Sequence, residues 1–237
     1  MLLNDRSKNS WREQSEIRRK VTNAPSKEIK SMSLTRIITG LSWHIDNHVV
    51  DLPVAEDLRK LYREGWIYLQ TADTVMVEQL EAQDEVTRER LIGQRNVYPM
   101  PLGPTVLGSS LLDYSVNGSD EDDVRIAKVH ETLWPTRNLE KDRREAENNR
   151  MARSCFRDTL IVSTAIHYVA AALITNDGGI LEARGRLSQE FNGFCVMSIN
   201  EATLRAFVAV RQLRKIAILR PDNPRFQNLP SWPPEPL

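Results

Sequence analysis

The chain has 237 residues, of which 41% are hydrophobic and 27% are charged, and its 32 basic side chains are balanced by 32 acidic ones. This composition is that of an ordinary globular protein, and the zero net charge argues against a protein that coats nucleic acid through bulk positive charge. No apolar run approaches the roughly 18 residues of a membrane span, and the first residues mix acids with bases unlike a signal peptide, so we expect a cytoplasmic protein with no membrane association.

The first part of the chain predicts a polar arm followed by two pairs of strand and helix. Residues 1–33 lack apolar periodicity and end in NAPSKE, which indicates an arm. Beyond it, β-branched and aromatic runs favour strands, and runs with one apolar face favour helices. The expected elements are a strand over 35–46, a helix over 54–64, a strand over 66–70 and a helix over 73–90.

The middle of the chain, at about 92–150, predicts an insertion. Its first part, 93–119, is rich in Gly, Pro and Ser and is expected to be loop with one strand at TVLGSSLL. Two helices are expected after it, over 121–133 and 138–153, separated at Trp134-Pro135 because the residue before proline disfavours helix.

The last part of the chain again alternates helix and strand. A stretch that opens at Asp158 and is apolar nearly all round predicts a buried helix. It is followed by a strand over 172–175, a helix to about residue 190, a strand over 194–199, a helix capped at Asn200, and a proline-rich tail over 220–237.

This alternation predicts an α/β fold, a three-layer sandwich with a mostly parallel central sheet and helices on both faces. The domain is expected to span 34–219, with the arm and the tail as terminal extensions. In such sheets the functional site lies beyond the carboxyl ends of the strands, at the point where the strand order reverses.

Four acids are expected to meet at that edge. Asp46 and Asp177 end two of the expected strands, Asp158 opens the buried helix, and Glu78 lies early in the helix after the second strand. Clustered carboxylates repel one another unless a cation neutralises them, and oxygen ligands of this kind suit Mg²⁺ or Mn²⁺. The sequence therefore favours a carboxylate metal site.

Each acid also has a simpler interpretation. Asp158 suits a helix N-cap, and Asp177 before two glycines suits a turn. Asp46 suits a cap for the following loop, and Glu78 suits a solvated helix face, where Glu81 competes for any role. Their joint placement by one fold is the argument for a shared site.

A zinc site is the alternative offered by SWHIDNHVVD, where His44, Asp46 and His48 alternate along one strand face. It lacks an evident fourth protein ligand, and we interpret the histidines as residues that flank Asp46 and pack. Cys155 and Cys195 form no zinc spacing and are expected to be reduced.

The carboxy-terminal half resembles PIN domains, a family of nucleases. The run DTLIVSTAI from Asp158, followed 19 residues later by Asp177 in LITND, is similar to the family's acid-opened helix and its apolar strand into TxD.

The first half adds two weaker matches, since HIDNHVV around Asp46 looks like the family's opening strand and VMVEQL around Glu78 looks like its second acidic helix. The resemblance covers about residues 36–200, with Asn47 where the family usually has Thr or Ser, and an insertion longer than that of compact toxin-type members.

The resemblance implies a Mg²⁺- or Mn²⁺-dependent endoribonuclease that hydrolyses RNA phosphodiester bonds with Asp46, Glu78, Asp158 and Asp177 as metal ligands. Thr175 or Asn176 is expected to position the water or a phosphate oxygen. Phosphate contacts, which carry no sequence information, are expected from basic residues between 137 and 157, a segment that contains seven Lys/Arg and four acids. These candidates are Arg143, Arg144, Arg150, Arg153 and Arg157.

Two other classes stay open. The same fold with a degraded site would serve as an RNA-binding or protein-assembly scaffold, with partners bound through the terminal arms. A phosphatase of the DxD type lacks its motif after the first strand. The oligomeric state is left open, a homodimer being one option.

Overall fold

The computed structural model describes residues 39, 41–46, 55–80, 85, 119–168, 170–226, 229 and 231–233. The chain divides into two compact units, Met1–Thr35 and Arg36–Leu237, and every described residue belongs to the second. Several expectations fall outside the described residues: the arm over 1–33, the ends of the first strand and of the helix over 73–90, the strand at TVLGSSLL, and the side chains of Asn47, His48 and Glu81.

One parallel sheet forms the centre of the second unit, as the sequence predicts. Its strands are β1 (Ser42–Ile45), β2 (Tyr68–Thr71), β3 (Ala172–Ile174) and β4 (Val196–Met197), in the spatial order β2-β1-β3-β4. β1 pairs with β2 on one side and with β3 on the other, so the strand order reverses between β1 and β3. In open parallel sheets such a reversal of the strand order leaves a crevice beyond the carboxyl ends of the strands.

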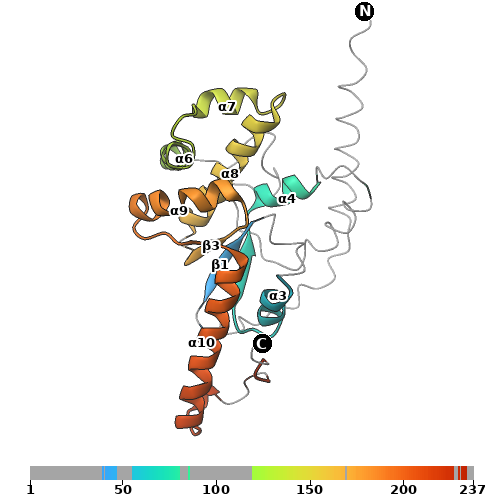
Figure 1. Cartoon of the computed structure of the whole chain (residues 1–237), viewed down its shortest axis with the longest axis vertical. Helices are drawn as coiled ribbons and strands as arrows, with labels where there is room; N and C mark the ends of the chain where they lie inside the picture. Colours follow the sequence, from blue (N-terminus) through green and yellow to red (C-terminus); the bar gives the residue numbers. More distant parts are fainter. Residues whose placement is uncertain are drawn as a thin grey trace, which may run out of the picture. The chain divides into compact units, whose positions relative to one another are not determined.

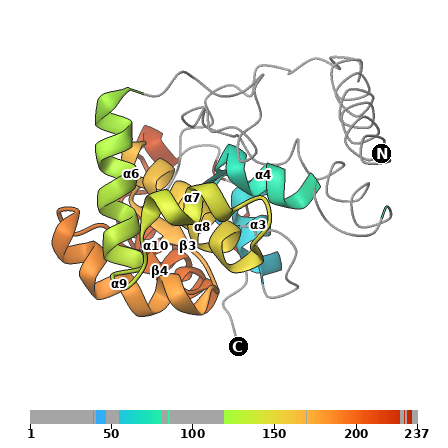
Figure 2. The same ribbon diagram turned by 90° about the horizontal axis from the view of Figure 1, so that it is seen from above.

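Seven α-helices lie in the described residues. Helix α3 packs against α10, whereas α8 packs against α4, α6 and α7, and α6 also contacts α9 (Figures 1 and 2). This arrangement is compatible with a three-layer sandwich. Their bounds are α3 Glu56–Arg63, α4 Asp73–Leu80, α6 Asp120–Leu133, α7 Leu139–Glu145, α8 Arg150–His167, α9 Gly178–Glu190 and α10 Ile199–Leu219. None of the helices described is both long enough and apolar enough to cross a bilayer.

The core holds the central strands in place. All three residues of β3 are fully buried, and Trp43 and Ile45 of β1 are each 1% exposed. Trp232, from the proline-rich tail, stacks on the fully buried Trp66 with ring centroids 4.9 Å apart and planes inclined by 28°. The tail therefore contributes an aromatic side chain to the core despite its prolines.

The helix that carries Asp158 differs from the prediction. A helix over 138–153 and a second one opening at Asp158 are wrong, because α7 ends at Glu145 and α8 runs unbroken from Arg150. Asn149 makes the break, since its side chain accepts hydrogen bonds from the N–H groups of the first turn of α8. Asp158 consequently lies inside α8 and caps nothing.

The starts of the last two helices are fixed by their caps. Ser198, and not Asn200, caps α10, with Glu201 completing a reciprocal capping box. Asp177 caps α9 through a hydrogen bond from the N–H of Ile180 to Oδ1 at 2.9 Å. The strands before them are shorter than predicted: β4 ends directly before its cap at Ser198, and β3 ends at Ile174, with two residues before the cap at Asp177.

Candidate four-carboxylate site

Asp46 directly follows β1 at the point where the strand order reverses. Its N–H donates to the carbonyl of Ile174 at 3.0 Å, which extends the β1–β3 ladder by one residue. Its side chain is only 2% exposed, and Oδ2 accepts a hydrogen bond of 2.6 Å from the hydroxyl of Thr175, which is itself fully buried. The carboxylate is thereby held at the carboxyl edge of two adjacent strands.

Asp177 is joined to Asp46 through the same hydroxyl. The N–H of Asp177 donates to Thr175 Oγ1 at 2.9 Å, so this oxygen donates to one acidic residue and accepts from the backbone of the other. Of the two side-chain oxygens of Asp177, Oδ1 serves the cap of α9, and Oδ2 accepts no hydrogen bond from the part of the chain described.

The first turn of α9 approaches a tryptophan closely. A Cβ atom at Gly179 would lie 2.5 Å from Cη2 of Trp134, and the ring is anchored by its Nε1–H, which donates to the carbonyl of Cys155 at 3.1 Å. Only glycine fits there without a shift of the ring or of the helix. This packing sets the position from which Asp177 faces the site.

Asp158 shares an electrostatic environment with the other three acids. Burial, followed by the negative charges of Asp46, Asp177 and Glu78, raises the pKa of Asp158 to about 9. No hydrogen bond or ion pair joins its partly buried carboxyl to another residue of the described ranges. Asp158, on α8, therefore lies within electrostatic range of the other three sequence-predicted acids, which come from the end of β1, from α4 and from the β3–α9 junction.

These carboxylates do not form a finished coordination sphere. Within the described ranges, no three His, Cys, Asp or Glu side chains lie close enough together to hold one metal ion. The raised pKa of Asp158 agrees with this, because charge repulsion acts over longer distances than the 2.0–2.6 Å of a metal–oxygen bond. The donor chemistry fits a hard divalent cation, but side chains must move to bind one.

Thr175 and Asn176 already have structural partners. The Thr175 hydroxyl donates its one proton to Asp46 and accepts from the N–H of Asp177, so it positions the acids and has no proton left to donate to a phosphate oxygen. Asn176 is exposed, and its Oδ1 accepts a hydrogen bond of 3.3 Å from the N–H of Ile199 at the start of α10.

The predicted phosphate-binding arginines divide into two groups. Arg153 donates to the carbonyls of Ala146 and Glu147, at 2.7 and 2.6 Å, and so fastens the connection between α7 and α8. Arg157 is only 6% exposed, because it falls on the buried face of α8, and the structure does not support its predicted role. The exposed members of the set are Arg143, Arg144 and Arg150.

His44 packs beneath Asp46 on the same face of β1. It is 1% exposed, its Nε2 contacts the amide of Gln70, and Nδ1 has no hydrogen-bond partner among the described residues. Burial lowers the pKa of His44 to about 4, so the ring is neutral at physiological pH. Its ring stacks at 6.4 Å on that of Tyr168, as expected for a packing residue.

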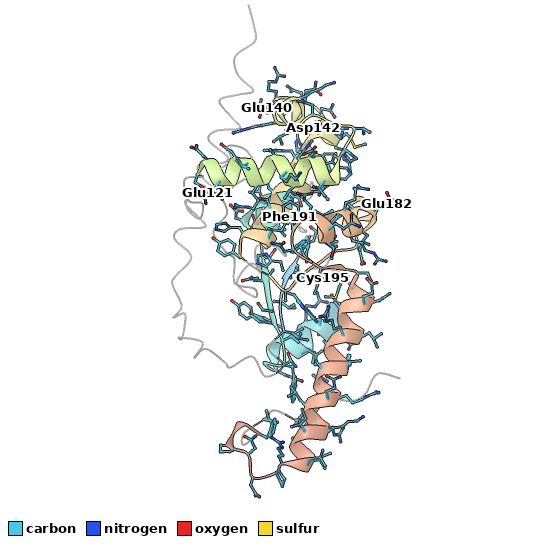
Figure 3. All side chains as sticks on the ribbon, turned by 90° about the vertical axis from the view of Figure 1, so that its left-hand side faces the viewer. Glu121, Glu140, Asp142, Glu182, Phe191 and Cys195 are labelled. Carbon is cyan, nitrogen blue, oxygen red and sulfur yellow. The ribbon has the colours of Figure 1, made fainter. Side chains whose placement is uncertain are left out.

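Two buried acids were not singled out from the sequence. Asp73 at the start of α4 is 1% exposed and, after burial, contributes to the raised pKa of Tyr168. Asp142 (labelled in Figure 3) is 2% exposed and joins α7 to α6 through His130 Nε2 at 3.0 Å and Arg137 Nε at 2.8 Å. The sequence signal for Asp73 was its place at the start of the helix expected after the second strand, whereas nothing local distinguished Asp142.

No protein-family model, curated protein or solved structure matches this chain.

Proposed function

We propose that this chain is a PIN-like endoribonuclease that depends on Mg²⁺ or Mn²⁺ and hydrolyses RNA phosphodiester bonds. One observation carries the proposal: at the switch point between β1 and β3, the hydroxyl of Thr175 links Asp46 to Asp177. Two further acids, Asp158 and Glu78, share this environment. Open parallel sheets bind their ligands at this crevice.

The four carboxylates are the groups that would hold the cation. A bound divalent ion supplies positive charge, which activates water and stabilises negative charge on the scissile phosphate. The chain's own contribution is placement: Thr175 orients Asp46, the first turn of α9 orients Asp177, and rigid α8 presents Asp158 from the facing layer. Helices and strands hold such groups more accurately than loops do.

Phosphate groups are expected to bind near the four-carboxylate site through exposed cations. Arg143 and Arg144 on α7 and Arg150 at the start of α8 are exposed, and α7 packs on α8, which carries Asp158. Contacts from these arginines fix the position of the backbone without reading bases, so we expect little sequence preference from them.

The decisive experiment replaces one acid at a time. Asp158→Asn and Asp177→Asn keep the side-chain volume but remove negative charge, and each is expected to lower Mn²⁺-dependent RNA cleavage by at least about 100-fold. Glu182→Gln is the matched control, because Glu182 is an exposed α9 residue outside the site (Figure 3) and should leave cleavage unchanged. Circular dichroism should show that all three variants fold, and full cleavage by either aspartate variant contradicts the assignment.

A scaffold without catalysis is the second candidate. It is favoured by the finding that no three potential ligands of the described part are arranged to hold a metal ion. The two candidates separate in one assay, in which wild-type chain and labelled RNA are mixed with EDTA or with Mn²⁺. Binding without cleavage in Mn²⁺ supports the scaffold, whereas cleavage that EDTA stops supports the nuclease.

A further inference from the structure

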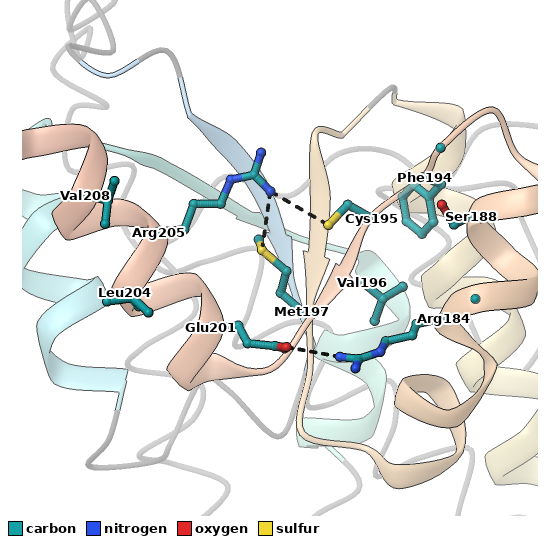
Figure 4. Close-up of a pocket in the computed structure, with 12 residues that line it drawn as sticks. Arg184, Ser188, Phe194, Cys195, Val196, Met197, Glu201, Leu204, Arg205 and Val208 are labelled. Carbon is teal, nitrogen blue, oxygen red and sulfur yellow. Dashed lines mark hydrogen bonds and ion pairs between the residues drawn. The ribbon is translucent and has the colours of Figure 1, made fainter. Parts of the chain in front are cut away.

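An open groove runs along the edge of the sheet at β4, beyond which no strand of the described residues lies, and β4 is set there between α9 and α10 (Figure 4). Its volume is about 740 Å³. One wall is formed by α10, whose Leu204 and Val208 are 64% and 44% exposed although both are large and apolar. Adjacent exposed apolar side chains of this kind mark interaction surfaces when they line a concave site.

The backbone of β4 offers hydrogen-bonding groups to this groove. The carbonyl of Cys195 accepts from Leu173 at 2.9 Å and that of Met197 accepts from Thr175 at 3.0 Å, so both face β3. Because the backbone groups of successive strand residues point alternately to the two sides, the N–H and C=O of Val196 face away from β3. An edge of this kind is a template for an added strand.

The positively charged side chain of Arg205 lies across the same groove. Nη1 of Arg205 is 3.9 Å from Sγ of Cys195 and 3.8 Å from Sδ of Met197 (Figure 4). Sulfur is a weak acceptor, and no carboxylate of the described residues pairs with Arg205. The second arginine of the groove, Arg184, is different, because it forms an ion pair of 3.1 Å with Glu201. Arg205 therefore retains strong donors for a ligand.

We propose that this groove binds an extended segment of a partner protein, which adds as a strand beside β4 and places an acidic side chain on Arg205. Val196 supplies the backbone pairing, Leu204 and Val208 contact aliphatic side chains of the segment, and Arg205 selects its charge. The surface is separate from the four-carboxylate site and does not depend on the proposed nuclease function.

The charge of Arg205 favours this occupant over two others, the chain's own first residues and a second copy of the chain. The chain's own residues 1–38 contain nine Lys or Arg against four acids, which is the wrong sign for Arg205. A second copy paired edge to edge would bring the two Arg205 side chains to one short strand pair, where like charges repel. An acidic, aliphatic segment from a different protein meets neither objection.

The test selects linear peptides from a phage-displayed random library on the full-length chain. We expect enrichment of peptides with Asp or Glu next to aliphatic residues, and fluorescence anisotropy should show at least about tenfold weaker binding by Arg205→Glu. Replacing the peptide's acid with lysine should restore binding to that variant. Arg214→Glu, at an exposed position on the same helix, and Asp158→Asn should both bind as the wild type does.

The addition of the peptide as a strand can be tested separately, by changing the peptide and leaving the protein as it is. N-methylation of the peptide at the residue that pairs with Val196 should weaken binding by at least about tenfold, since it removes one backbone hydrogen bond and adds a clash. Hydrogen exchange at the Val196 amide should slow when the unmodified peptide binds. The proposal is overturned if no peptide prefers wild type over Arg205→Glu, if N-methylation has no effect, or if sedimentation shows that the groove is covered by a second copy.

Discussion

Asp158 determines how the four-carboxylate site responds to pH in the absence of metal. Its pKa of about 9 in the folded chain lies above the ordinary value of 3.8, so between these values the folded chain holds a proton that the unfolded chain releases. The folded state binds more protons there, and stability must fall as the pH rises from about 4 to 9. Asp158 therefore opposes folding at neutral pH.

Asp158→Asn is accordingly expected to raise the melting temperature in EDTA at pH 8, because the variant has no carboxylate to ionise. For a chain of this length, each kcal/mol recovered adds roughly 2–4 °C. Calorimetry in EDTA and in Mn²⁺ measures the effect: Mn²⁺ should stabilise the wild type and have little effect on the variant. A lower melting temperature for the variant in EDTA would contradict the raised pKa of Asp158, whose first cause is burial and whose second is the charge of the other acids.

The sequence predicts the position of a site residue best where the order of the strands alone determines that position. Asp46, Glu78, Asp158 and Asp177 were predicted to meet because parallel strands end at one edge, and in the structure burial, followed by the negative charges of the other three, raises the pKa of Asp158. Hydrogen-bond partners were not predictable, because they depend on side chains far away in the chain. Thr175, expected to position a water or phosphate, instead bonds Asp46, which lies 129 residues earlier.

At the scale of elements, the first turn of α9 depends on one glycine. Gly179→Ala would bring a methyl group against the anchored ring of Trp134, and overpacking of this kind costs about 1–3 kcal/mol. We expect a melting temperature several degrees lower, and weaker stabilisation by Mn²⁺ because Asp177 moves with the helix.

The same helix provides the control for this substitution. An alanine at Gly185, inside α9, would meet no atom within 4 Å. Because glycine in a helix interior is less favourable than alanine by about 0.8–1.0 kcal/mol, Gly185→Ala should raise the melting temperature. Equal effects of the two substitutions in thermal unfolding would argue that Trp134 does not restrict the start of α9.

Helices and strands were predicted well in type and less well in their ends. The period of the apolar residues indicated every strand and α-helix of the described ranges, but α8 was predicted to open at Asp158 and in fact begins at Arg150. The error has a physical reason. The first turns of α8 are exposed and its later turns are buried, so the apolar pattern changes within the helix, and such a change resembles the pattern at a helix end. Caps such as Asn149 and Ser198 were decided by side-chain geometry.

At the scale of the whole molecule, stability in acid depends on ion-paired carboxylates outside the site. Burial opposes ionisation of Asp122, but hydrogen bonds from Ser119 and the ion pair with Arg125 hold the pKa of Asp122 at about 2. Arg137 and His130 likewise lower the pKa of Asp142 against the effect of its burial. Both stabilise the fold above about pH 4, and this contribution is lost as the pH falls through their folded-state pKa values.

We therefore expect the chain to lose stability between pH 4 and pH 2, and Asp122→Asn to make this loss shallower. Asp123→Asn is the matched control, because Asp123 is exposed on the same helix and accepts no hydrogen bond from the described residues. Urea unfolding at several pH values measures the slope for each protein. The same slope in both variants and the wild type would remove Asp122 from the explanation.

The Thr175–Asp46 bond spans 129 residues, and the backbone of Thr175 is in turn held by the carbonyl of Met197. A ribosome that has released only the first 170 residues has therefore made three of the four acids but neither the hydroxyl that aligns Asp46 nor the strand that carries it. Contacts of such long range form late in folding. The four-carboxylate site therefore forms only in a complete and folded chain, because a truncated or half-folded copy lacks the arrangement on which any chemistry at the site would depend.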